Sequence, residues 1–324
     1  MSQQQQRILA KELRIPVAQV TATVDLLADG ATVPFISRYR KEATGSLDEV
    51  QVTAIRNRLA ELAELDKRRQ SIIESLTTRE LLSGELQASL HKADNLAGLA
   101  DSSRPYKPKR RTKAIIAPEK WWEPLPRALF ARYTDHVDAA AYVDDEKGVG
   151  SIDDAYGGAR DIIAEWINEH AGARARLRKL FLHQAVIRSK VLKGKEQEGK
   201  KYRDYFDWEE RAKNIPSHRM LAMRRGENEK ILSLSMVPEE KEALFVLERK
   251  FLQGRNASTD QVNIALKDAY KRLLKPSMEN ELKAVLKKKA DEEAIKVFSK
   301  NLRDLLLYPA LGQKKVLAIH PGFR

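Results

Sequence analysis

Apolar positions recur at helical spacing over most of the chain. Between residues 47 and 76, six of them lie three or four positions apart, or multiples of that interval: Val52, Ile55, Leu59, Leu62, Ile73 and Leu76. This period places them on one face and predicts an amphipathic helix. Ser46 and Glu49 match the capping-box pattern that begins such a helix.

The same reasoning predicts helices along most of the remaining chain. Their expected ranges are 3–14, 17–29, 84–93, 125–133, 137–143, 152–169, 173–192, 217–225, 238–253, 258–274 and 277–308, with a further short helix opening at Thr32. Ser151 is placed to cap the helix at 152–169. Residues 231–237 alternate between apolar and polar types and predict a short strand.

The last predicted helix is the longest. No glycine or proline interrupts residues 277–308, which as a helix would extend about 48 Å. We expect Met278, Leu282, Val285, Leu302 and Leu305 to face other helices, while the lysines at 287–289 stay solvated.

These elements define a mainly α fold. It comprises multi-helical N-terminal and central regions, with helix-turn-helix-like units and a long linking helix. The predicted division is 1–192, 193–308 and 309–324, and a proline-rich loop at 101–126 joins two helical groups in the first region. Residues 315–320 form an apolar run that predicts one strand near the C-terminus.

The composition adds a strong positive charge. Lysine and arginine total 59 against 46 acidic residues, a net charge of +13. Such a surplus attracts polyanions, chiefly nucleic acid. The chain has no cysteine, which excludes disulfides and cysteine-ligated metals. It shows neither a signal peptide nor an apolar run long enough to span a bilayer, which favours the cytoplasm and no membrane partner.

The densest positive charge lies between residues 174 and 203. Eleven basic residues stand there against Glu196 and Glu198. The predicted binding residues of this stretch are Arg174, Arg176, Lys179, His183, Lys190, Lys193, Lys195, Lys200 and Lys201. In a helix over 173–192, Arg176, Lys179, His183 and Lys190 would share an arc of roughly 60°. A solvated charged face is the alternative interpretation.

A second basic cluster occupies residues 104–113, which include no acidic residue. Its candidate binding residues are Lys107, Lys109, Arg110 and Arg111, beside Tyr106. Basic loops with an aromatic residue suit phosphate contact combined with base stacking. An ordinary linker, or a docking site for an acidic helix, explains the same string equally well.

No catalytic or cofactor motif emerges from the sequence. The six histidines lack the spacing of a zinc site, so we expect no metal. Gly148 and Gly150 precede a helix, but no strand comes before them and no Lys-Ser or Lys-Thr pair follows, so a phosphate-loop interpretation fails. The sequence therefore indicates a protein without a cofactor that is not an enzyme.

Longer strings resemble a known family. They are GATVPFISRYRKE at 30–42 after Leu26-Leu27, YKPKRRT at 106–112, GARDIIAE at 158–165, and PSHR at 216–219 with RGE at 225–227. Together they resemble the Tex family of bacterial transcription accessory proteins, over essentially the whole chain. The resemblance makes 1–192 the Tex-like N-terminal helical domain and 193–308 the central region. It makes 309–324 the first strand of a ribonuclease-H-like (YqgF) domain.

That resemblance also implies a relation to a eukaryotic transcription elongation factor, with RNA-binding modules further along the family's chains. Relatives commonly place Asp-Pro-Gly after the first ribonuclease-H-like strand, where this chain has His320-Pro321-Gly322. Magnesium prefers carboxylate oxygens to an imidazole, so we expect no nuclease activity.

The function predicted from these observations is a transcription accessory scaffold that binds nucleic acid. RNA is the favoured ligand, with RNA polymerase or transcription factors as possible protein partners, and the sequence does not give the oligomeric state. A helical protein-interaction module without nucleic-acid contact is the alternative. A metal-dependent nuclease is the third and least favoured.

Overall fold

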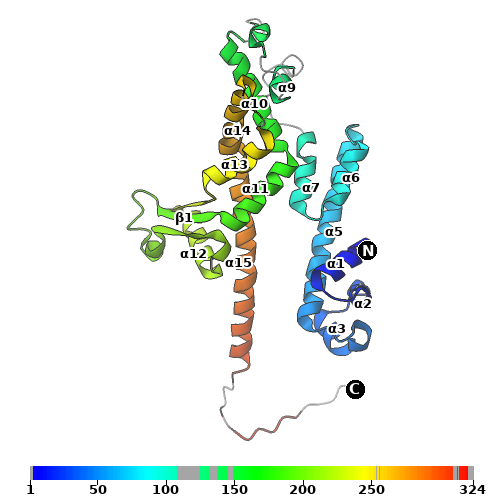
Figure 1. Ribbon diagram of the computed structural model, residues 1–324. Helices are drawn as coiled ribbons and strands as arrows, with labels where there is room; N and C mark the ends of the chain where they lie inside the picture. The colour runs from blue at the N-terminus through cyan, green and yellow to red at the C-terminus, as the bar shows by residue number, and fades with distance from the viewer. Residues whose placement is uncertain are drawn as a thin grey trace. The chain divides into compact units, whose positions relative to one another are not determined.

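The structure is a computed structural model that describes residues 3–107, 124–131, 137–144, 149–252, 254, 256–308, 312 and 314–319. The chain divides into two compact units, Met1–Arg110 and Arg111–Arg324. The predicted boundary after residue 192 falls within the second unit. Helices dominate both units (Figure 1), which confirms the mainly α fold.

The N-terminal unit is a helical bundle built on one long helix. Its elements are α1 (Gln3–Leu13), α2 (Val17–Ala28), α3 (Val33–Tyr39), α4 (Lys41–Thr44), α5 (Glu49–Thr78), α6 (Gly84–Lys92), α7 (Leu96–Ser103) and the short 3-10 helix η1 (Arg104–Tyr106). Val52, Ile55 and Leu62 of α5 are buried among Leu9, Val20 and Ile36 of the shorter helices. The helical period read from the sequence therefore does mark the core face.

The capping box of α5 lies two residues later than predicted. Asp48, not Ser46, is the N-cap: its carboxylate accepts from the backbone N–H of Gln51 at 2.7 Å. The Gln51 side chain in turn accepts from the N–H of Asp48. Ser46 has a φ of 64° and follows the left-handed Gly45. It therefore still belongs to the end of the preceding turn.

The second unit combines helices with one small sheet. Its elements are α9 (Pro124–Phe130), η2 (Ala139–Tyr142), α10 (Ile152–Glu169), α11 (Ala171–Gln184), β1 (Val186–Val191), η4 (Lys200–Tyr205), β2 (Asp207–Arg211), η5 (Ala212–Asn214), α12 (Ser217–Asn228), β3 (Leu232–Val237), α13 (Glu240–Phe251), α14 (Ala257–Asp268), the π-helix η6 (Ala269–Leu274) and α15 (Lys275–Leu306). Ser151 caps α10 as predicted, accepting from the N–H of Asp154. The strand predicted at 231–237 is confirmed as β3.

The sheet has the order β2-β1-β3, and both pairings are antiparallel. Its central strand overturns one prediction: the helix expected over 173–192 ends at Gln184, and residues 186–191 form β1. Ile187 and Ser189 are buried while Lys190 is exposed, so this segment follows a period of two. The prediction was wrong because β1 is short and follows the helix after a single linking residue.

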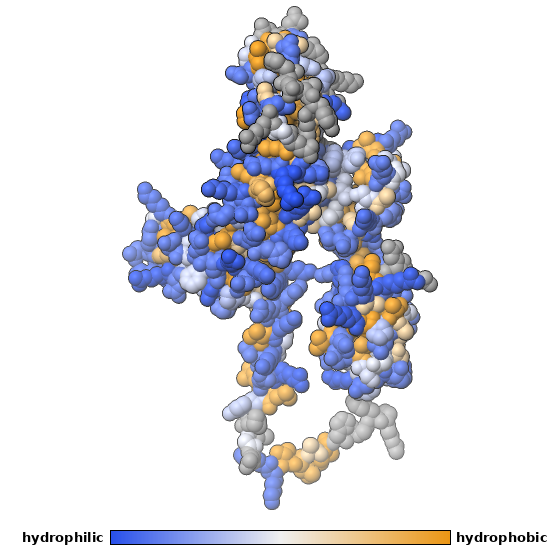
Figure 2. Space-filling model, in the orientation of Figure 1, coloured by the Kyte–Doolittle hydropathy of each residue, from blue (hydrophilic) through white to orange (hydrophobic). Residues whose placement is uncertain are grey.

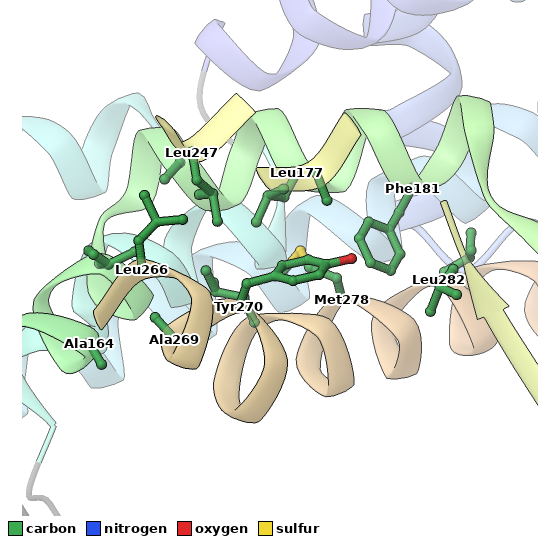
Figure 3. Close-up of a cluster of buried hydrophobic side chains, with 14 of the residues drawn as sticks. Ala164, Leu177, Phe181, Leu247, Leu266, Ala269, Tyr270, Met278 and Leu282 are labelled. Carbon is green, nitrogen blue, oxygen red and sulfur yellow. The ribbon is translucent and has the colours of Figure 1, made fainter. Parts of the chain in front are cut away.

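The core of the second unit forms where α11 packs on the column made by α14, η6 and α15. Phe181 and Leu177 of α11 point toward Tyr270 of η6 and Met278 of α15 (Figure 3). Burial raises the pKa of the Tyr270 phenol to about 12. The column continues through Pro276 without a break, because proline is tolerated in the first turn of a helix.

The long helix α15 confirms the predicted continuous rod, but only its first half is covered. Met278, Leu282 and Leu286 are buried. Val285, Leu302 and Leu305, which were expected to face other helices, are 51%, 43% and 70% exposed. Beyond Ala290, none of the residues described in α15 is buried.

No strand forms among the described residues near the C-terminus, contrary to the strand predicted at 315–320. Residues 314–319 lack regular structure, and Val316, Leu317 and Ile319 are more than two-thirds exposed. A strand needs a neighbour for its backbone hydrogen bonds, and the described part of the chain pairs none with this segment. His320 lies outside the described residues.

Close packing of α12 on β3 generates a testable prediction. A Cβ added to Gly226 would lie 2.6 Å from Cδ1 of Leu232, too near for ordinary contact. Gly226→Ala should therefore lower the free energy of unfolding by about 1–3 kcal/mol through overpacking. Urea denaturation followed by circular dichroism measures the change.

The matched control is Gly157→Ala in α10, where the nearest atom to an added Cβ is 3.9 Å away. Alanine in that open helical position should stabilise the protein by roughly 0.5–1 kcal/mol. Equal effects of the two substitutions would contradict the close approach of α12 to β3.

Candidate nucleic-acid interface

The first residue of the predicted basic face, Arg174, lies inside the protein. Its side chain is fully buried, and its guanidinium donates to Glu281 at 2.8 Å, to Ser277 at 2.7 Å and to Asn168 at 3.2 Å. Arg178 donates to the other oxygen of the same Glu281 carboxylate at 2.7 Å. These contacts join α11 to α15, so Arg174 is not available to a phosphate.

The burial of Arg174 decides which residues of α11 face the solvent. Leu177 and Phe181 point to the core on the same side as Arg174. At about 100° per residue, Arg176, Lys179 and His183 then fall on the opposite side. All three are exposed, and the described residues include no ion-pair partner for Arg176 or Lys179. We call these three residues the α11 ridge.

Positive charge at the start of α11 also acts on His170. This histidine caps the helix: its Nδ1 accepts from the backbone N–H of Ala173 at 3.1 Å, and its ring packs edge-on against Phe251. Burial, together with the charges of Lys250 and Arg176, holds the pKa of His170 below its usual value.

Lys190 does not belong to the α11 ridge, because it lies on the sheet. Its neighbours across β1 are Asp207 of β2 and Ser233 of β3. Beside it, Arg188 pairs with Glu209 at 2.9 Å and with Glu239 at 3.5 Å. This sheet face thus carries charges of both signs, and its attraction for phosphate is weaker than that of the ridge.

The remaining predicted residues of the first cluster follow β1. Lys195 pairs with Glu198 at 2.5 Å, and Lys201 pairs with Glu229 at 2.8 Å. The Lys201 ammonium lowers the pKa of Glu229, while Glu229 raises that of Lys201. Lys193 and Lys200 are exposed, and no carboxylate of the described chain pairs with either. Those two lysines could extend the surface offered by the ridge.

The second predicted cluster, at residues 104–113, precedes α11 and the sheet in the chain. Lys107 is exposed, directly after η1 in the N-terminal unit, where the carbonyl of Tyr106 accepts from Arg79 at 2.7 Å. Lys109, Arg110 and Arg111 lie outside the described residues. The structure therefore describes only Lys107 of this cluster.

Sequence reasoning missed an exposed row on α13. Lys241, Phe245 and Arg249 recur every four residues, and Phe245 is 58% exposed. The end of α13 meets the start of α11 where Phe251 touches His170, and its beginning approaches β1 where Glu239 pairs with Arg188. The two helices thus run antiparallel, side by side. The spacing of four residues in the sequence already places these side chains on one face of a helix. Only the structure shows that this helix lies beside α11.

On the face shown in Figure 2, hydrophilic residues predominate around these elements, with hydrophobic residues among them. The described residues include no group of three or more histidine or acidic side chains able to hold a metal ion. Among the same residues, no helix is both long and apolar enough to cross a bilayer. The described residues thus form a helical protein in which the α11 ridge faces outward and Phe245 is exposed on the adjacent helix α13.

Comparison with known proteins places this architecture in a family. Residues 3–77 match the description "Tex-like protein N-terminal domain", and residues 133–298 match "Tex central region-like". The chain belongs to the Tex family, as its sequence strings indicated.

Several named proteins are similar to the chain over nearly all its length. It is 39% identical to "Transcriptional accessory protein Tex" of Neisseria gonorrhoeae and 39% identical to "Protein YhgF" of Escherichia coli. It is 26% identical to human "S1 RNA-binding domain-containing protein 1". In each case 98% of this chain is covered, but only 43%, 43% and 33% of the relative. The chain thus spans less than half the length of these relatives.

The anchoring role of Arg174 predicts a difference in stability between two neighbouring arginines. Arg174→Ala leaves Glu281 with Arg178 alone and opens a hole in the core, so it should lower the free energy of unfolding by about 2–3 kcal/mol. Arg176→Ala removes an exposed side chain and should change it by less than about 0.5 kcal/mol. Urea denaturation of both variants measures the contrast, and equal destabilisation would show that Arg174 is not the anchor.

Proposed function

We propose that this chain is a nucleic-acid-binding, non-catalytic part of a transcription accessory protein that acts in the cytoplasm. The observation that carries the proposal is the α11 ridge: Arg176 and Lys179 point outward, without a described carboxylate partner, while the basic residues that point inward are neutralised. Unpaired exposed cations on a rigid helix are suited to phosphate oxygens, because no internal ion pair has to break first.

The kind of contact determines the kind of recognition. Lysine and arginine that bind phosphate fix the position of a strand but carry no information about its bases. We therefore expect the ridge to bind without sequence preference, with Lys193 and Lys200 extending the surface. The names of two relatives, a transcriptional accessory protein and an S1 RNA-binding domain protein, favour RNA in a transcription context. Contact with RNA polymerase or transcription factors is part of the same proposal.

A protein-interaction module is the second candidate function, and one observation favours it. The second half of α15 exposes a stripe of apolar side chains at helical spacing: Ile295, Phe298, Leu302 and Leu305 are 43–70% exposed. Orange side chains along this part of α15 are visible in Figure 2. Such a stripe is typical of a surface that another polypeptide covers.

Salt dependence separates the two candidate functions. Replacing Arg176 and Lys179 together by alanine should weaken binding of single-stranded RNA and flatten the dependence of log K on log salt by roughly 0.7 per lost contact, about 1.4 in total. The loss should be similar for different sequences. Fluorescence anisotropy across a salt series measures both quantities.

The control removes the same charge elsewhere. Lys287→Ala with Lys289→Ala takes two exposed lysines from α15, of which Lys287 already pairs with Asp291. This variant should retain the affinity and slope of the unaltered protein. If the two double variants weaken binding equally, the ridge is only part of a diffuse positive field. If neither changes it, the ridge is not the RNA contact, whereas failure of the unaltered protein to bind RNA would favour the protein-interaction function.

A further inference from the structure

The N-terminal unit presents two aromatic rings to the solvent. Phe35 and Tyr39 of α3 are 40% and 68% exposed, and their ring centroids lie 5.7 Å apart at an interplanar angle of 40°. They are four residues apart and so lie on one side of the helix. Large aromatic side chains gain most from burial, so an exposed pair in direct contact calls for an explanation.

The short helix that carries the rings is firmly held. Thr32 caps α3 by accepting from the N–H of Phe35 at 3.4 Å, and proline occupies its first turn. Val33 and Ile36 are buried in the core of the unit. The rings therefore stand on a fixed support, while Pro34 borders an open hollow of about 740 Å³ that leaves room beside α3.

Basic residues stand next to the two rings in the chain. The guanidinium of Arg40 lies 5.5 Å from the centroid of Phe35. Arg38 and Lys41 are exposed, and neither has an ion-pair partner among the described residues. The acidic neighbour Glu42 approaches Arg40 only to 3.8 Å, in a pair whose side chains are 49% (Arg40) and 69% (Glu42) exposed. Exposed pairs of this kind are weak, so an incoming anion can displace this one.

Together these groups match the chemistry of single-stranded nucleic acid. We propose that Phe35 and Tyr39 stack against its bases while Arg38, Arg40 and Lys41 contact the flanking phosphates. Every base has an aromatic face, so such a site accepts any sequence but requires unpaired bases. An apolar protein segment would gain little from the three cations, and a purely electrostatic site would not need the exposed rings.

The inference rests on the proposed function and deepens it. The α11 ridge offers cations for phosphates, whereas the cluster on α3 adds contact with the bases themselves. Because stacking requires unpaired bases, we expect the N-terminal unit to prefer single-stranded nucleic acid to duplexes.

Oligonucleotides with and without bases test the stacking directly. Binding of the full chain is measured by fluorescence anisotropy with a labelled oligouridine of about 12 nucleotides, and with an abasic strand that has the same number of phosphates. Unaltered protein should prefer the strand with bases. Phe35→Ala with Tyr39→Ala should weaken binding to that strand by at least about fivefold and leave the abasic strand unaffected.

Two further variants exclude trivial explanations. Phe298→Ala removes a phenylalanine of α15 that is 66% exposed and should change neither affinity. Tyr39→Trp keeps an aromatic face and should retain binding even if alanine at this position disturbs the helix. Circular dichroism of each variant reports the helical content.

The outcomes separate this inference from the function on which it rests. Equal binding of both strands, unchanged in the double alanine variant, would overturn the stacking site while leaving phosphate binding by the ridge intact. Failure of the unaltered protein to bind either strand would overturn both. Loss of affinity in Tyr39→Trp equal to that of the double alanine variant would show that stacking is not the cause.

Discussion

The arrangement of the second unit depends on one carboxylate. Glu281 of α15 accepts from the fully buried Arg174 and from Arg178, both on α11. A buried guanidinium is tolerated only where its donors are satisfied, so α11 must pack in the one rotation that brings Arg174 to Glu281 and Ser277. That rotation also buries Leu177 and Phe181 against Tyr270, and it leaves the α11 ridge facing outward. The same helix thus supplies both the interior contact and the proposed binding surface.

The sequence contained enough information for the helices but not for the direction of every charge. Amphipathic segments such as α10 and α15 were predicted close to their observed limits, because their period and caps are local properties. The prediction that Arg174 binds nucleic acid was wrong because its ion-pair partner Glu281 lies 107 residues further along the chain. No local sequence pattern reveals such a partner. Lys190 was placed on a helix because β1 offers only six residues of alternation after α11.

The candidate sites show the same limit. Phe35 and Tyr39 lie within the string at 30–42 that indicated the family, yet nothing local distinguishes an exposed ring from a buried one. Leu302 and Leu305 continue the apolar period of α15 but are exposed, because neighbouring elements cover only the first part of that helix. The period of apolar residues in a sequence identifies the apolar face of a helix. Only the tertiary structure shows whether another element packs against that face.

Lysine footprinting tests the central claim, that the α11 ridge is the nucleic-acid contact of the second unit. The chain is acetylated with and without saturating single-stranded RNA, and the modification of each lysine is read by mass spectrometry. Lys179 should become protected by RNA, together with Lys193 and Lys200, whereas the exposed lysines at 287–289 should react equally in both states. Unchanged reactivity of Lys179 in the RNA-bound protein would contradict the account.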